Sequence, residues 1–169
     1  MRTTELLADA FGRIAELVTH VVSGLTPDEL AYRPDAAANS VGWLVWHLTR
    51  IQDDHVAQAA GIPQVWTSAG WADRLGLPFG PAETGYGQGP QEVGAVTVKS
   101  GEQLIGYHDA VCEQTVTYLR DRTDADLDQV VDDSYDPPVT LGVRLVSVVS
   151  DDLQHAGQAA YLRGILSRR

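Results

Sequence analysis

Apolar residues recur every three or four positions along four long stretches of the chain. This spacing gathers them on one face of an α-helix. Each of the first two stretches is followed by glycine, which favours a helix end, and the last is expected to end in Ser167-Arg168-Arg169, whose cations suit a helix C-terminus. The four stretches are residues 4–23, 43–60, 100–119 and 140–166. Residues 25–30 and 124–127 are predicted to form short helical turns, and residues 132–139 a loop with a short extended piece.

The segment from Ile62 to Lys99 breaks this pattern with seven glycines and four prolines. It also contains Trp66 and Trp71, and residues 69–75 can form one helical turn. A connection of this length either crosses the end of a bundle or covers a site as a lid. Its tryptophans therefore either anchor it to the core or lie near a substrate entrance. Four helices with one long crossover between the second and third predict an all-α four-helix bundle, with residues 1–169 forming a single domain.

The charge balance narrows the possible partners. The 169 residues include 23 Asp and Glu against 12 Lys and Arg, for a formal charge of −11. A net negative field repels phosphate backbones and anionic lipid surfaces, which argues against binding to nucleic acid or membranes. Cys112 is the single cysteine, so no intramolecular disulfide can form. The chain shows no signal-peptide core and no transmembrane run, and a cytoplasmic location is expected.

The last helix carries the candidate chemistry. Asp151 and His155 lie four residues apart, so they stack on one helix face together with Val148, Leu162 and other residues. This face is mostly apolar and is expected to point into the core, where an unpaired charge is costly. A divalent metal is one partner that both side chains could share. The simpler alternative is that Asp151 pairs with His155 or with an arginine.

A third ligand has two candidates among the histidines. His47 shares a face of the second helix with Leu44 and Ile51, and His108 lies on the apolar side of the third helix. Asp53 and His55 are expected to lie toward the flank as solvated polar residues. Cys112 is expected to be a packed thiol rather than a nucleophile.

His47, Asp151 and His155 together would make a set of two histidines and one carboxylate. Three protein ligands leave coordination positions open, as at a catalytic zinc. The same set suits nickel, manganese or ferrous iron, so the ligands do not select the metal. Without a second cysteine, a thiolate-rich structural zinc site is excluded.

Two motifs and the helix order resemble the DinB-like superfamily over nearly the whole chain. The motifs are Gly42-Trp43-Leu44-Val45-Trp46-His47-Leu48 and Asp151-Asp152-Leu153-Gln154-His155-Ala156-Gly157-Gln158. Many relatives have histidine where this chain has Asp151. The carboxylate version is similar to the branch that contains mycothiol S-transferases and the mycothiol-dependent maleylpyruvate isomerase.

The resemblance implies a metal triad of His47, Asp151 and His155, with zinc as the first choice of metal. It further implies a metal-dependent S-transferase that joins a small-molecule thiol, mycothiol or a similar one, to an electrophile. Asp54 and Gln158 are then candidates for polar contacts with substrate. Arg144 is a further candidate, with a salt bridge at the helix end as the alternative.

Two other functions stay open at this stage. One is a thiol-dependent isomerase of the maleylpyruvate type, although that relative carries an additional domain. The other is a metal-binding or dimerisation module without catalysis. A homodimer is compatible with each of these functions.

Overall fold

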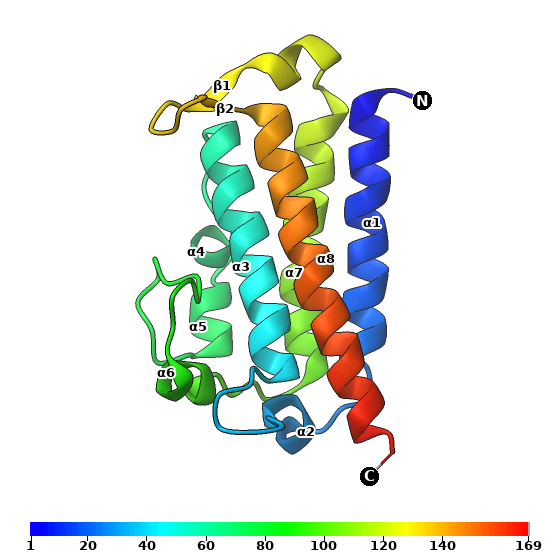
Figure 1. Cartoon of the computed structure of the whole chain (residues 1–169), viewed down its shortest axis with the longest axis vertical. Coiled ribbons are helices and arrows are strands. Elements are labelled where there is room, and N and C mark those ends of the chain that lie inside the picture. Colours follow the sequence, from blue (N-terminus) through cyan, green and yellow to red (C-terminus); the bar gives the residue numbers. More distant parts are fainter. Residues whose placement is uncertain (169) are drawn as a thin grey trace.

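The structure is a computed structural model that describes residues 1–168. Its four long helices lie side by side along the long axis of the molecule (Figure 1). Helices α1 and α3 each pack against α7 and α8, which gives a four-helix bundle and confirms the predicted all-α class. The long helices are α1 (Thr3–Val22), α3 (Val41–Ala60), α7 (Gly101–Arg120) and α8 (Leu141–Leu166). The expected helix end at residues 167–169 differs, because α8 ends at Leu166, and Arg169 lies outside the described residues.

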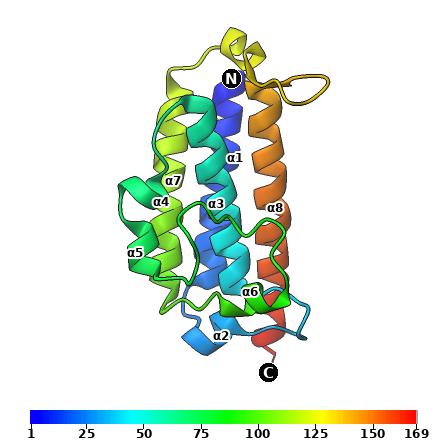
Figure 2. The ribbon, with the colours of Figure 1, turned by 90° about the vertical axis from the view of Figure 1, so that its left-hand side faces the viewer.

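Short elements close the two ends and one side of the bundle (Figure 2). The turns predicted at residues 25–30, 69–75 and 124–127 are present as α2, α5 and η1, whereas α4 and α6 were not predicted. Strands β1 and β2 pair antiparallel, with Val130 opposite Thr140. The bounds are α2 (Pro27–Ala31), α4 (Val65–Ser68), α5 (Trp71–Leu75), α6 (Pro90–Ala95), the 3₁₀-helix η1 (Asp124–Asp128), β1 (Val130–Asp132) and β2 (Val139–Thr140).

The core lies between the four long helices and is filled by large apolar side chains. Phe11 of α1, Trp46 of α3, Leu104 of α7 and Leu145 of α8 are each at most 1% exposed. Burying one such side chain contributes roughly 1.5–3 kcal/mol to folding. The bundle is therefore held chiefly by its apolar faces, and polar side chains inside it need specific partners.

The buried face of α8 differs from the predicted one. The prediction placed Asp151, His155 and Gln158 on that face, but Gln158 is exposed and the other two are only half-buried. Because α8 packs against both α3 and α1, its buried strip is centred between these helices, and Asp151 and His155 lie at its edge. The strip consists of Leu141, Leu145, Val148, Asp152, Ala156, Ala159 and Leu162.

The crossover is anchored to α3 by two buried charged residues. Arg50 donates hydrogen bonds from Nε to the carbonyl of Glu83 (3.0 Å) and lies 3.6 Å from Asp53. Asp53 accepts hydrogen bonds from the backbone amides of Val65 (2.8 Å) and Trp66 (2.7 Å). The expectation of a solvated Asp53 was wrong, since it is 1% exposed. Its partners lie on a distant segment, which compensates the cost of burying the charge.

Candidate metal centre

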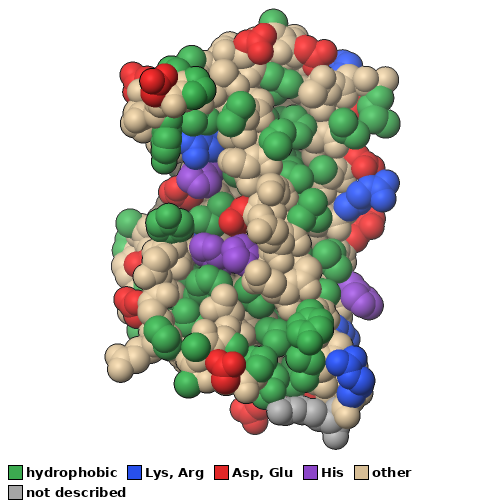
Figure 3. Space-filling model, viewed as in Figure 1, with side chains coloured by type: hydrophobic (Ala, Val, Ile, Leu, Met, Phe, Trp, Pro, Cys, Tyr) green, Lys and Arg blue, Asp and Glu red, His purple; other side chains and the backbone are tan. Residues whose placement is uncertain are grey.

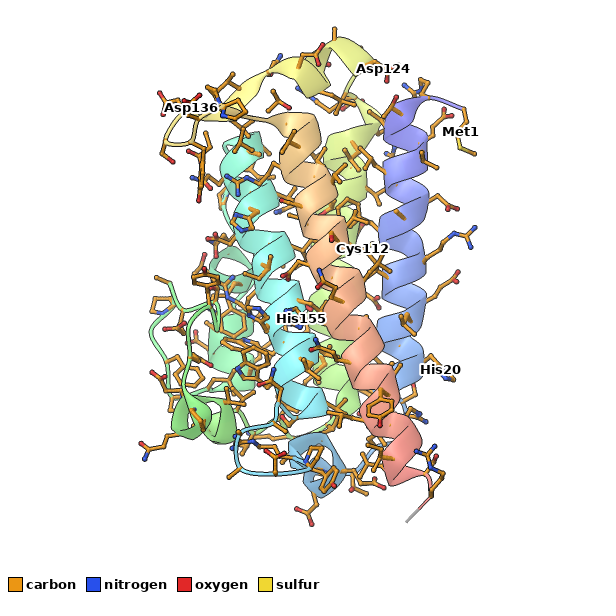
Figure 4. The ribbon with its side chains drawn as sticks, in the orientation of Figure 1. Met1, His20, Cys112, Asp124, Asp136 and His155 are labelled. Atoms are coloured by element: carbon orange, nitrogen blue, oxygen red, sulfur yellow. The ribbon has the colours of Figure 1, made fainter. Side chains whose placement is uncertain are left out.

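Two adjacent helices bring three candidate ligands together. His47 comes from α3, and Asp151 and His155 come from α8. One ligand atom from each of the three lies within 4.8 Å of the others, and no other such group of three exists among residues 1–168. Histidine side chains gather on the face made by these helices (Figure 3), and His155 lies between α3 and α8 (Figure 4).

Hydrogen bonds orient both histidine rings. Nδ1 of His47 donates to the carbonyl oxygen of Thr84 (2.6 Å), because a carbonyl can only accept. Nδ1 of His155 lies 3.1 Å from Oε1 of Gln158 and donates to it. Each ring therefore carries its proton on Nδ1 and keeps the lone pair on Nε2. Metal-binding histidines typically donate their second nitrogen to an oxygen in this way.

One carboxylate oxygen of the site lacks a partner that a cation could provide. Oδ1 of Asp151 lies 3.6 Å from Nε2 of His155. Its other oxygen, Oδ2, is buried and has no hydrogen-bond partner among the described residues. Burial lowers the pKa of His47 from its usual value, which keeps the ring neutral. Two imidazole rings beside a carboxylate oxygen without a partner fit a divalent metal.

Trp43 forms one wall of the site, a role that was not predicted for it. Its ring stacks on His47 at 4.5 Å between centroids and meets His155 edge-on at 6.2 Å. Its indole Nε1 donates to Oε1 of Gln88 in the crossover (2.8 Å). The signal that could have found it is its spacing, four residues before His47 on the same helix.

The crossover reaches the site through a glycine. Gly85 follows Thr84 with φ +91°, a conformation that favours glycine. A Cβ atom there would lie 2.8 Å from Nδ1 of His47 and 3.2 Å from Trp43. The absence of a side chain therefore lets the backbone lie directly on the imidazole and present the Thr84 carbonyl.

The other two candidate histidines are placed differently. His108 is fully buried, and burial lowers its pKa to about 4. Its Nδ1 lies 3.1 Å from Oγ1 of Thr49, and it does not belong to the group of three ligands. His55 is half-buried beside Arg144, with 3.5 Å between Nδ1 and Nη1, rather than solvated. Burial and that guanidinium lower the pKa of His55.

The candidate substrate contacts divide into two groups. Asp54 and Arg144 line one pocket of about 400 Å³, together with Ile51 and Thr84. Arg144 also forms the expected type of salt bridge, donating to Asp132 (2.8 Å). Ile51 lies one turn after His47, and the Thr84 carbonyl accepts a hydrogen bond from His47. This pocket therefore borders the triad.

Gln158 contacts the triad directly through His155, whereas the two tryptophans of the crossover do not reach it. Trp66 is buried at 5.1 Å from Tyr107, and Trp71 packs on the same tyrosine at 5.8 Å. Both rings therefore lie against α7. They anchor the crossover to the bundle, which is the alternative that the sequence left open.

Cys112 lies apart from the triad. It belongs to α7, and its Sγ approaches the carbonyl oxygen of Phe11 on α1 at 3.8 Å. Burial raises the pKa of this thiol. A half-buried thiol with a raised pKa is a weak nucleophile at neutral pH.

The comparisons with known proteins agree with this architecture. A comparison with curated protein sequences found no match. The crystal structure of a conserved protein from Enterococcus faecalis is similar over 100% of this chain and 99% of that one, with 29% sequence identity and a TM-score of 0.92. Within the described residues, no helix is long and apolar enough to cross a membrane. Residues 10–159 match the model of the DinB superfamily, and the chain therefore belongs to that superfamily.

Proposed function

We propose that this protein is a divalent-metal-dependent thiol S-transferase. It joins a low-molecular-weight thiol, mycothiol or a similar one, to the electrophilic carbon of a second small molecule. The observation that carries the proposal is the triad itself, in which one ligand atom from each of His47, Asp151 and His155 lies within 4.8 Å of the others and Oδ2 of Asp151 has no hydrogen-bond partner among the described residues. Three protein ligands leave room for a substrate atom, which is typical of a catalytic site.

The chain's own residues prepare the site before any substrate arrives. The Thr84 carbonyl and Gln158 fix the two histidine rings, so that their orientation costs nothing further on binding. Trp43 covers one face of His47 and excludes water from it. Zinc is the first choice of metal, although nickel, manganese and ferrous iron suit the same ligands.

A bound divalent ion supplies Lewis-acid chemistry, lowering the pKa of a thiol so that the thiolate forms near neutral pH. In the transfer, the sulfur forms a bond to the electrophilic carbon and the leaving group departs with its electron pair. The thiol proton passes to solvent. The net reaction is therefore a substitution that needs no oxidant or reductant.

The lining of the pocket next to Ile51 is suited to a polar thiol substrate. Asp54, His55 and Arg144 line it, and the exposed rings of Tyr86 and Tyr135 lie at its rim. Carboxylate, imidazole and guanidinium groups can hydrogen-bond a hydroxylated molecule, and tyrosine rings can stack on it. This pocket is where we place the body of the thiol.

The proposal is tested by incubating the protein, loaded with zinc, with mycothiol and other biological thiols and with an alkylating electrophile. We expect a thioether product whose rate rises with pH until the thiol is fully ionised. Asp151→Asn should reduce the rate by a factor on the order of 100 or more, since it removes the one anionic ligand. Cys112→Ala should keep most of the wild-type rate of thiol transfer.

Three outcomes would contradict the proposal. Loss of transfer in Cys112→Ala, with folding and metal content intact, would make the protein thiol the nucleophile. Metal binding without turnover of any thiol would favour the non-catalytic module. Conversion of maleylpyruvate in the presence of the thiol would instead favour the isomerase.

A further inference from the structure

A second pocket, of about 440 Å³, lies between α8 and the start of α3. Its apolar wall comes from Leu44, Leu162 and Ala38. The loop before α3, which supplies Ala38, runs beside α8 (Figure 2). Of the described residues that line it, none is charged. A charged group bound there would lack a partner, whereas an uncharged group needs no partner of opposite charge.

This pocket borders the candidate metal centre on the side opposite to the polar one. Gln158 both lines it and bonds to His155 at 3.1 Å. Along α3, Leu44 lies one turn before His47, and Ile51 of the polar pocket lies one turn after it. The triad therefore lies between an uncharged, apolar pocket and a charged, polar one.

We propose that the apolar pocket binds the uncharged aromatic or alkyl group of the electrophilic substrate. Its volume is in the range of small-molecule sites, which are mostly apolar with a few polar groups. The proposal rests on the thiol transferase function and names its second substrate class, hydrophobic electrophiles. The polar pocket holds the thiol, so the two reactants approach the triad from opposite ends.

Gly157 makes the pocket testable without damage to the fold. It is an exposed helical glycine of the pocket wall, and a Cβ added there meets no described atom within 4 Å. A Cβ at this position is therefore tolerated, and we expect the longer side chain of Gly157→Leu to occupy part of the pocket. Gly12 of α1 is the matched control, because a Cβ at this helical glycine is equally free of the described atoms and it lines none of the pockets described above. Leucine improves helix propensity equally at both positions.

Binding is measured first, without metal or thiol. Benzyl alcohol is titrated into ¹⁵N-labelled, metal-free protein, and amide chemical shifts are followed by NMR. We expect saturable shifts near Leu44, Gly157 and Leu162, at least about tenfold weaker binding in Gly157→Leu, and unchanged binding in Gly12→Leu. Unsaturable shifts, or unchanged binding in Gly157→Leu, would overturn the proposal.

Turnover is compared next for benzyl chloride and iodoacetamide with one thiol. Gly157→Leu should lower kcat/KM for benzyl chloride about tenfold more than for iodoacetamide, and Gly12→Leu should change neither. Equal effects on both electrophiles would overturn the pocket assignment and leave the transferase function standing. If the wild-type protein transfers no thiol, the proposed transferase function is wrong. The NMR titration still tests whether the apolar pocket binds an uncharged group. Dissociation of a wild-type dimer by Gly157→Leu in analytical ultracentrifugation would assign the pocket to a second copy of the chain and also overturn the proposal.

Discussion

At the residue scale, the three candidate ligands differ in what each contributes. His47 and His155 offer ring nitrogens, and Asp151 offers a carboxylate oxygen. We expect His47→Ala, His155→Ala and Asp151→Asn each to weaken zinc binding by about 100-fold or more, since loss of even an indirect partner costs 10–100-fold. Metal content after gel filtration measures this.

The control for this prediction is His20→Ala. This histidine projects from the outer side of α1, far from His155 (Figure 4). It should keep the wild-type metal content. Full retention of zinc in His47→Ala would exclude this set of ligands.

Asp152 is a second residue with a testable consequence. Neither of its side-chain oxygens has a hydrogen-bond partner among residues 1–168. Burial, together with the neighbouring Asp151, raises its pKa well above the usual value. Well below the usual aspartate pKa of 3.8 the carboxyl is protonated in both states, and its burial costs little. As the pH rises, the unfolded chain releases the proton while the folded one retains it, so stability falls until the folded-state pKa is reached.

Asp152→Asn should remove this pH-dependent loss. In metal-free protein we expect the free energy of unfolding at pH 8 to increase by roughly 1–3 kcal/mol, and the difference from wild type to shrink toward pH 4. Urea unfolding at several pH values measures it. The low pKa of His108 contributes equally to the pH dependence of stability in wild type and in Asp152→Asn, so it cancels in their difference. A difference that grows as the pH falls would contradict the assignment.

At the scale of elements, the crossover controls the site through its contact with α3. Gly85→Ala puts a Cβ 2.8 Å from Nδ1 of His47, so either the ring or the Thr84 carbonyl must move. We expect zinc affinity to fall by roughly 10–100-fold, the range for loss of an orienting hydrogen bond. Competition with a fluorescent chelator measures it.

Gly87→Ala is the matched control for that change. Gly87 also has positive φ (+75°), but no described atom lies within 4 Å of an added Cβ. It should share the backbone strain and retain zinc affinity. Equal losses in both variants would mean that strain, and not contact with His47, matters.

At the scale of the whole molecule, the candidate site links α3 to α8 across one face of the bundle. A metal that binds the folded form alone stabilises it by about 2.7 kcal/mol when its concentration is 100 times Kd. For a chain of this size each kcal/mol raises Tm by roughly 2–4 °C. We therefore expect zinc to raise Tm by roughly 5–11 °C, as measured by calorimetry. A similar rise in His47→Ala would place the stabilising ion elsewhere.

The bundle itself could be predicted from the sequence. The apolar spacing within α1, α3, α7 and α8 depends only on neighbours along the chain, and so do the glycine-rich limits of the crossover. The three candidate ligands could also be named, because His47, Asp151 and His155 stand in recognisable motifs. These features are local, and local patterns survive in sequence.

The surroundings of the site were decided by tertiary structure. The packing of α8 against two helices turned Asp152 inward and left Asp151 and His155 at the edge of the buried strip, a rotation that periodicity alone cannot choose. Asp53 was predicted to be solvated and is buried, because its partners lie on the crossover. The approach of Gly85 to His47 likewise joins segments almost forty positions apart in sequence. A contact between distant segments leaves no periodic signal in either of them, so only the folded chain shows it.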